Sequence, residues 1–459
     1  MRTFNLTVVI LNITDKAKPL LIKLLPIQFL RRAKRLIISR KMKRLAKGGS
    51  LKPFAREAYL DGVNLVGYIQ GETGLGQSCR LLAHALEKSG IPFSISDYIQ
   101  VSAIRFSDDS WLHKITDQAI YNINIIHINP YEIPLAFSRL GRHLWDRRYN
   151  IAYWLWELEV FPEEWENAFL LADEIWAPSE FVCKSIRKST DKPVFVIPYV
   201  FPPLDCGDHT RKDFQLPEDK VLFLSMYDSS SITERKNPLG AIRAYKQAFS
   251  IEDNHVGLVV KINNLENQDI RQLKSELEGY PNTYFITDVL DRSQVNALIA
   301  CVDVFVSLHR AEGFGLVLAE AMLLGTAVIA TNWSANAEFM NCEVSCPVNF
   351  ELILLNEDYG PFRAGNRWAD PDLTQAAEYM KRLSENDTYR AELSKNARIH
   401  MEKHFAPERT FELMKNRINQ IYDKEVEDED HDSDYGGGKR RALLAEKQKS
   451  LAKTVSVID

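Results

Sequence analysis

The sequence has few cysteines and no long apolar run. Its six cysteines, at positions 79, 183, 206, 301, 342 and 346, include no Cys-x-x-Cys pair, so their spacing predicts neither a zinc site nor a disulfide framework. We expect reduced thiols, as in a cytoplasmic protein. No apolar run reaches the roughly 18 residues that span a bilayer, and residues 4–13 lack the small-residue cleavage site of a secretory signal. The sequence therefore predicts neither a membrane span nor a secretory leader.

The chain also lacks a positive overall charge. Its net charge is −5, yet residues 1–50 hold 13 Lys/Arg against the single acid Asp15, so the remaining chain carries about −17. This balance excludes a general nucleic-acid binder. Residues 16–47 interleave Leu, Ile and Phe with Lys and Arg on both sides of Pro26. Such a pattern is typical of a basic amphipathic helix on an anionic membrane surface, and equally of an arm that packs on its own protein.

The order of the sequence patterns indicates two domains of the same kind. After a linker-like segment, Lys47–Pro53, apolar strand patterns alternate with helical patterns, and a second such series begins near Lys220. Alternation of this kind is the sequence form of βαβ units. The chain therefore predicts an α/β protein with two doubly wound, Rossmann-like parallel-sheet domains that face each other across a cleft. The predicted parts are a basic arm (1–52), an N-terminal domain (53–200), a C-terminal domain (201–400), a C-terminal helix that returns to the N-terminal domain (401–423) and a disordered charged tail (424–459).

One short stretch, "RAEGFGLVLAEAM", carries a pair of glutamates, Glu312 and Glu320, around Gly-Phe-Gly. A strand is predicted to end near His309, followed by a helix over Leu316–Leu324 that Gly325 ends. Glu312 then lies at the carboxyl end of a strand, where open α/β sheets bind ligands. The small residues Gly313 and Gly315 allow a close approach to the backbone. The amides of Phe314, Gly315 and Leu316 at the helix N-terminus favour a phosphate, and Glu320 one turn further on can accept hydrogen bonds from a ribose diol.

With this motif, residues 60–420 resemble the retaining glycosyltransferases of family 4, which have the GT-B fold. The resemblance implies that Glu312 contacts the transferred sugar and that Glu320 binds the ribose. The segment "DSSSITERKNPLGAIRAYKQAF" is similar to the diphosphate-binding segment of that family, with Lys236 as the phosphate lysine. Arg235 directly precedes it, where the family often has an arginine about five residues earlier, and either cation can meet the diphosphate. The stretch "GETGLGQSCRLLAHAL" is similar to the glycine-rich first loop, with Gly74 and Gly76, and His127 takes the position of a donor-site histidine.

Four further residues are candidates for contacts with the acceptor or the sugar. Trp156 and Glu157 lie in "YWLWELEVFPEEW", whose aromatic rings suit either sugar stacking or the filling of a core. Ser334 and Asn336 follow the strand that ends at Thr331, where they can reach sugar hydroxyls. No metal site is predicted, because Lys236, Arg235 and helix amides can neutralise a diphosphate.

The predicted function is transfer of a hexose, of mannose or glucose type, from a UDP- or GDP-linked sugar to a glycan or lipid-linked acceptor. The resemblance implies retention of the anomeric configuration, a role in polysaccharide or glycolipid synthesis, and no cofactor beyond the donor. The expected location is the cytoplasm, peripherally on the inner face of the membrane. Two alternatives keep the fold, a nucleotide-sugar epimerase and a non-catalytic nucleotide-sugar-binding protein. An NAD-dependent oxidoreductase is a third, but Gly71-x-x-Gly74-x-Gly76 has the wrong glycine order for a dinucleotide fingerprint.

Overall fold

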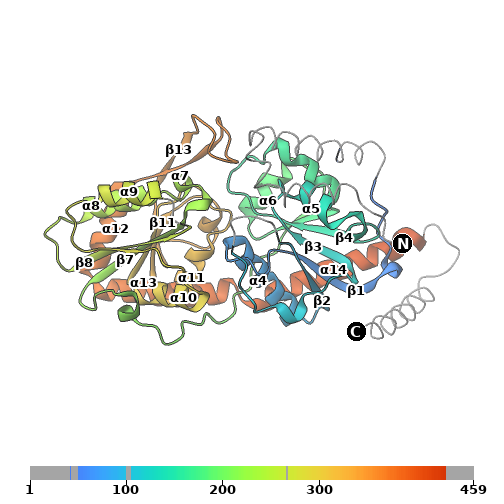
Figure 1. The fold of residues 1–459 in the computed structure, drawn as a ribbon, viewed down its shortest axis with the longest axis horizontal. Coiled ribbons are helices and arrows are strands. Elements are labelled where there is room, and N and C mark those ends of the chain that lie inside the picture. Colours follow the sequence, from blue (N-terminus) through green and yellow to red (C-terminus); the bar gives the residue numbers. More distant parts are fainter. Residues whose placement is uncertain (1–41, 43–49, 100–104, 265–266, 431–459) are drawn as a thin grey trace, which may run out of the picture.

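The computed structural model describes residue 42 and residues 50–99, 105–264 and 267–430. These residues form two α/β domains that lie side by side, each built around a six-stranded sheet (Figure 1). Most of the predicted basic arm, including residues 16–41 and 43–47, lies outside the described residues, as do residues 431–459 of the predicted tail. Among the described helices, none is both long enough and apolar enough to cross a membrane.

The N-terminal domain has a parallel sheet in the order β2-β1-β3-β4-β5-β6. Its strands are mostly buried, and the buried Asn64, Asn124 and Asn150 on three neighbouring strands are hydrogen-bonded to one another. The strands are β1 (Leu60–Gly67), β2 (Phe93–Asp97), β3 (Tyr121–His127), β4 (Tyr149–Tyr153), β5 (Glu174–Ala177) and β6 (Val194–Val196). The helices are α4 (Gly74–Ser89), α5 (Ile133–Leu140) and α6 (Glu180–Arg187).

The C-terminal domain has a parallel sheet in the order β12-β11-β10-β7-β8-β9, which is the strand order of a Rossmann fold. The strands are β7 (Val221–Asp228), β8 (Val256–Asn263), β9 (Thr283–Ile286), β10 (Val304–Ser307), β11 (Ala327–Thr331) and β12 (Cys346–Val348). The helices are α7 (Thr233–Lys236), α8 (Pro238–Ala248), α9 (Asn267–Glu276), α10 (Arg292–Cys301) and α11 (Leu316–Leu324). The two parallel sheets confirm the predicted fold class.

Each sheet has a point where the strand order reverses, and ligands of open α/β sheets bind in the crevice at that point. In the C-terminal domain the reversal separates β7 from β10, so the loop that leads to Lys236 lies beside the loop that holds Glu312. In the N-terminal domain it separates β1 from β3, which places the glycine-rich loop near His127. The topology therefore gathers the predicted site residues at two crevices.

An antiparallel hairpin, which the sequence patterns did not predict, projects from the C-terminal domain. It consists of β13 (Phe350–Leu354) and β14 (Arg367–Pro371), and Figure 1 shows it standing above the sheet toward the N-terminal domain. Its connecting loop places Phe362 against Trp156 of the N-terminal domain, with the ring centroids 5.4 Å apart. The hairpin thus covers one side of the region between the domains.

Three helices follow, α12 (Leu373–Glu385), α13 (Asp387–His404) and α14 (Pro407–Asp430). Helix α13 packs on α11 of the C-terminal domain, whereas α14 packs on α4 of the N-terminal domain. The crossing helix therefore starts at Pro407, not at residue 401, and it extends to Asp430. The predicted disorder from residue 424 is wrong for its first seven residues, because they continue this helix.

A buried ion pair attaches α14 to the N-terminal domain. The Nε atom of Arg417 lies 3.1 and 3.0 Å from the two carboxylate oxygens of Glu174, which is fully buried. Tyr149 and Trp176 also donate hydrogen bonds to this carboxylate, at 2.9 and 2.7 Å. The only positively charged one of these three donors, Arg417, is thus in place only when α14 is docked.

Replacing Arg417 by methionine should lower the free energy of unfolding by about 3–5 kcal/mol, because a buried carboxylate then loses its cation. Urea unfolding of the purified protein measures this change. The matched control is Arg398→Met, which breaks an exposed i,i+4 pair with Glu402 and should cost less than about 0.5 kcal/mol. Equal losses in the two variants would contradict the role given to the Arg417–Glu174 pair.

Candidate active site

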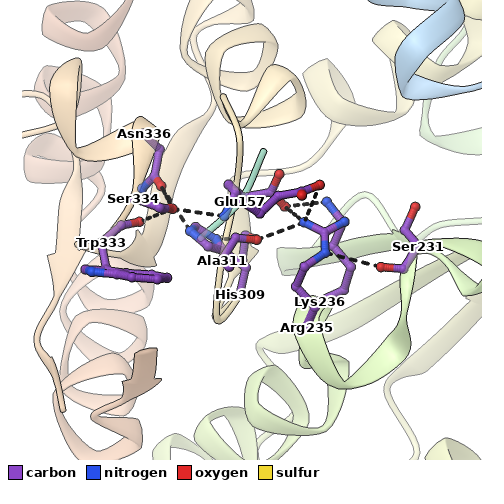
Figure 2. A network of polar contacts seen from close by, with 11 residues as sticks. Glu157, Ser231, Arg235, Lys236, His309, Ala311, Trp333, Ser334 and Asn336 are labelled. Atoms are coloured by element: carbon purple, nitrogen blue, oxygen red, sulfur yellow. Dashed lines mark hydrogen bonds and ion pairs between the residues drawn. The ribbon is translucent and has the colours of Figure 1, made fainter. Parts of the chain in front are cut away.

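The charged centre of the C-terminal domain is built on the short helix α7. Ile232, the residue before this helix, has a φ of 65°, which is strained for a β-branched side chain. The strained start turns the helix so that Arg235 and Lys236, in its last turn, meet the loop after β10. Glu312 in that loop forms ion pairs with both, to Lys236 directly and to Arg235 at 3.4 Å. Figure 2 shows the hydrogen bond from Arg235 to Ala311 of the same loop.

The two cations fix the charge of Glu312. Burial of this carboxyl acts to raise its pKa, but the neighbouring Lys236, Arg235 and His309 outweigh burial and hold the pKa at about 2. Burial also lowers the pKa of Lys236, and Glu312 opposes that shift. The site therefore holds a carboxylate that is ionised at neutral pH next to the amino group of Lys236.

Arg235 and Lys236 differ in what they can offer a ligand. The Arg235 side chain is 7% exposed and donates to the carbonyl oxygens of Ala311, at 2.8 Å, and Ser231, at 3.3 Å. The Lys236 side chain is 23% exposed. Arg235 is thus committed to the protein around it, whereas Lys236 can turn part of its ammonium group toward a bound anion.

A second layer of polar contacts holds the Glu312 loop. The Ser334 hydroxyl accepts a hydrogen bond from the Glu312 amide at 2.9 Å, and Ser334 adopts a φ of 73°, a strained value outside glycine. The Oδ1 atom of Asn336 accepts a hydrogen bond from the Nε2 atom of His309 at 3.0 Å, and its Nδ2 atom donates to the Thr331 carbonyl at 2.8 Å. Ser334 and Asn336 are almost fully buried, so their first role is to position the loop, and their contact with a sugar stays a prediction.

His309 is a site residue that the sequence did not single out. It is fully buried, and burial lowers its pKa to about 4, so the imidazole is neutral at pH 7. Its place at the carboxyl end of β10, directly before the Glu312 loop, was the available signal.

The Gly-Phe-Gly segment is used in three ways. Gly315 has a φ of 88° as the residue before α11, which favours glycine at that position. The Phe314 side chain is buried against Tyr199, with the ring centroids 4.7 Å apart, so only its backbone can face a ligand. A Cβ on Gly313 would lie 3.3 Å from the Trp156 carbonyl oxygen, so this glycine serves the contact with the N-terminal domain. Leu316 begins α11, as predicted.

Glu320 lies on α11 and is 1% exposed, and it forms an ion pair with Arg292 at the start of α10. Arg292 is the more exposed partner, with 36% of its side chain accessible. A ribose that reaches Glu320 therefore has to share the carboxylate with Arg292. The sequence gave no sign of this arginine, because its partner is 28 positions away on another helix.

His127 ends β3 but is only 1% exposed, and its Nε2 atom is hydrogen-bonded to Ser78 of α4. Burial lowers its pKa to about 3, so the ring is neutral. In the described conformation its ring is enclosed by protein and bonded to Ser78, which gives it a structural role in the N-terminal domain. Its donor-site role stays a prediction.

The glycine-rich loop leads into α4, whose first residue is Gly74. The Thr73 side chain accepts a hydrogen bond from the Gly76 amide at 3.2 Å. A Cβ on Gly76 would lie 1.8 Å from the Gly71 carbonyl oxygen, so this glycine is needed for the fold of the loop itself. A Cβ added to Gly74 would have no heavy atom within 4 Å, so the space beside this residue is open to a ligand.

Trp156 and Glu157 are neighbours in the sequence, but their side chains have different surroundings in the structure. The Trp156 ring is buried, and its Nε1 donates to the Val160 carbonyl at 2.7 Å, so the ring fills the region between the domains rather than offering a face to a sugar. Glu157 reaches across to the charged centre, 3.9 Å from Arg235. Within the described part of the chain, no group of three His, Cys, Asp or Glu side chains is arranged to hold a metal ion.

Two Rossmann-like parallel-sheet domains fit the predicted GT-B fold, and comparison with solved structures agrees. A sucrose-phosphate synthase from Thermosynechococcus elongatus matches with a TM-score of 0.57 at 15% identity, over 79% of this chain and 100% of that one. HepE from Anabaena, crystallised in complex with UDP and glucose, matches with a TM-score of 0.55 at 14% identity, over 78% of this chain and 100% of that one. At such identities the likeness concerns the fold alone.

Sequence comparison finds a likeness to a known family in the second domain. Residues 208–400 match the model of the family described as glycosyl transferases group 1. The chain is also similar to the O-antigen biosynthesis glycosyltransferase WclY of Escherichia coli, with 30% identity over 122 residues, which is 27% of this chain and 31% of that protein. The similarity thus spans about a third of the length of this relative.

The low pKa of Glu312 makes its stabilising effect depend on pH. Because its folded-state pKa of about 2 lies below the ordinary 4.5, its ion pairs stabilise the fold above pH 4.5 and are lost as the pH falls toward 2. The Glu312→Gln variant should therefore be less stable than the wild type near pH 6, and the gap should narrow below pH 4.5. Denaturant unfolding across this range measures it, with the exposed Glu343→Gln as control. A gap that does not change with pH would contradict the assignment.

Proposed function

We propose that the protein is a glycosyltransferase that moves a sugar from a nucleoside diphosphate donor to a hydroxyl of an acceptor. The observation that carries this proposal is the meeting of Lys236 and Glu312 at the switch point of the C-terminal domain, next to the N-terminus of α11. An ammonium group and free helix amides suit a diphosphate, and an adjacent ionised carboxylate suits a sugar that gains positive charge as its bond breaks.

In this proposal the leaving diphosphate binds to Lys236 and to the amides of Gly315 and Leu316. Arg235 holds the Glu312 loop and adds a second positive charge near the diphosphate. Glu312 faces the transferred sugar, and Glu320 with Arg292 meets the ribose. These groups neutralise the diphosphate without a metal. Stabilising the leaving group and the oxocarbenium-like sugar electrostatically is the main source of catalysis.

The finer features rest on the resemblance to retaining glycosyltransferases of family 4. They are a hexose of mannose or glucose type, a UDP or GDP carrier, and retention of the anomeric configuration. Two similar proteins support this choice, because HepE was crystallised with UDP and glucose and WclY is a glycosyltransferase of O-antigen biosynthesis. The proposed pathway is accordingly the synthesis of a polysaccharide or glycolipid, at the cytoplasmic face of a membrane to which residues 16–47 attach the enzyme peripherally.

The N-terminal domain supplies the acceptor side. Tyr131, in the loop after β3, exposes half of its surface, and its ring centroid lies 5.5 Å from that of Trp165. Exposed aromatic rings of this kind can stack on a sugar face. Tyr131 therefore takes the role that the sequence suggested for the buried Trp156, in a glycan or lipid-linked glycan acceptor.

Calorimetric titration with UDP, GDP and NAD tests the proposal. The wild type should bind UDP or GDP and not NAD, and Glu320→Gln should weaken the binding, because the ribose hydroxyls lose a charged acceptor. Transfer from a labelled UDP- or GDP-sugar then separates a transferase from an epimerase and from a non-catalytic binder. Binding of NAD, or nucleotide binding that ignores Glu320, would contradict the donor site.

The lysine assignment has its own test. Lys236→Ala should weaken UDP or GDP affinity by roughly tens-fold, because a charge-assisted hydrogen bond to phosphate is worth about 1.5–3 kcal/mol. Lys236→Arg, which keeps the charge, should retain more of the affinity. The exposed Lys212→Ala serves as control for a general loss of positive charge. An unchanged dissociation constant in Lys236→Ala would remove this lysine from the diphosphate site.

A further inference from the structure

One segment of the N-terminal domain, residues 153–165, presents three carboxylates to arginines of the C-terminal domain. Glu159 pairs with Arg367 at 3.1 Å and Glu164 with Arg363 at 2.8 Å, and these four side chains are between 37% and 52% exposed. The third carboxylate, Glu157, faces Arg235 at 3.9 Å, where the arginine is 7% and the glutamate 25% exposed. Two of the pairs thus lie on the solvent rim, and the third belongs to the charged centre.

Glu157 is held firmly in this place. The neighbouring Trp156 is fixed by the hydrogen bond of its indole to Val160 and by its stacking on Phe362 of the hairpin loop. On its other side, the Trp156 backbone lies against Gly313, directly after Glu312. The position of Glu157 relative to the Glu312 loop is therefore set by packing, and it depends on the contact between the two domains.

Arg235 connects the carboxylates of both domains. Its guanidinium Nη1 lies 3.9 Å from Glu157 and 3.4 Å from Glu312, and the same nitrogen donates to the Ala311 carbonyl at 2.8 Å. With Lys236, the centre contains two carboxylates and two cations, so its formal charge is zero (Figure 2). Burial raises the pKa of Glu157 and Arg235 opposes that rise, which fits a carboxylate that needs this arginine.

We propose that Glu157 is a positioning residue for sugar transfer, which acts from the opposite domain through Arg235 to keep Glu312 in its reactive orientation when the domains are together. This inference rests on the proposed function. It adds a reason why the two domains must meet for transfer, because the C-terminal domain alone supplies only one of the two carboxylates that hold Arg235.

Two effects of opposite direction follow from replacing Glu157 by glutamine. The centre gains a formal charge of +1, so a nucleoside diphosphate should bind more tightly, by about 3- to 10-fold, since one nearby negative charge is removed. Arg235 loses one of its two carboxylate partners, so Glu312 is placed less accurately, and kcat for transfer should fall on the order of 10- to 100-fold. A residue that only supports the fold would weaken binding and catalysis together.

The experiment compares Glu157→Gln with Glu159→Gln and Glu164→Gln, which remove the same charge from the same segment at the rim. Calorimetry gives the dissociation constants of UDP and GDP, and steady-state kinetics with a labelled donor give kcat and KM. We expect the rim variants to stay within about twofold of the wild type, as exposed pairs contribute little. Glu157→Asp, which keeps the charge, should recover part of kcat.

Three results would overturn the inference. They are an unchanged kcat in Glu157→Gln, a fall in kcat together with weaker nucleotide binding, and a response equal to that of the rim variants. If the wild type binds neither UDP nor GDP, the proposed function fails instead. The contact between Glu157 and Arg235 is then tested by a double-mutant cycle of Glu157→Gln and Arg235→Gln in urea unfolding. A coupling energy clearly larger than that between Glu164 and Arg363 supports the contact, and an equal coupling energy contradicts it.

Discussion

The structure depends on one buried carboxylate that stays ionised. Removing Glu312 from water is unfavourable, and the two cations of α7, together with His309, reverse that effect and hold its pKa at about 2. To bring these groups together, the chain uses the strand reversal between β7 and β10 and accepts strained backbone at Ile232 and Ser334. Strain of this kind persists where the surrounding contacts determine it and collects at functional sites. The strained residues Ile232 and Ser334 flank the same ion pairs. At this centre the contacts between side chains therefore outweigh the backbone preferences of single residues.

A neutral centre has a consequence for ligand binding. A diphosphate that approaches two cations already paired with carboxylates must share them, so the pairing lowers its affinity while keeping the cations in position. Lys236 is the cation with the more accessible side chain, and Arg235 is tied to two carbonyl oxygens as well as to the carboxylates. The different roles proposed for these neighbouring residues thus follow from their burial and their hydrogen bonds. In the proposed function Lys236 meets the diphosphate, and Arg235 holds the Glu312 loop in place.

The sequence predicted a helix or strand well where specific residues mark both of its ends. Helix α11 begins and ends at the predicted residues because Gly315 and Gly325 take positive φ values at its two ends. The β13–β14 hairpin was missed, since its short strands carry a weak pattern and its loop packs on a distant segment. Contacts such as Glu320 with Arg292 and Glu157 with Arg235 join residues far apart in sequence, and no local pattern specifies them. Trp156 shows the same limit, because an aromatic residue suits a core and a sugar site equally well.

The contacts between the domains differ in strength from one end of the molecule to the other. Helix α14 leaves the C-terminal domain after α13 and is fixed to the N-terminal domain by the buried Arg417–Glu174 pair, which is costly to break. At the charged centre, the rim pairs of Glu159 and Glu164 are exposed and each is worth less than about 1 kcal/mol. Among the ion pairs between the domains, those at the rim are therefore weaker than the pair that holds α14. Trp156 on Phe362 and Tyr199 on Phe314 pack rings across the same boundary, so opening of the cleft in the proposed reaction has to break these contacts as well as the rim pairs, while α14 stays attached.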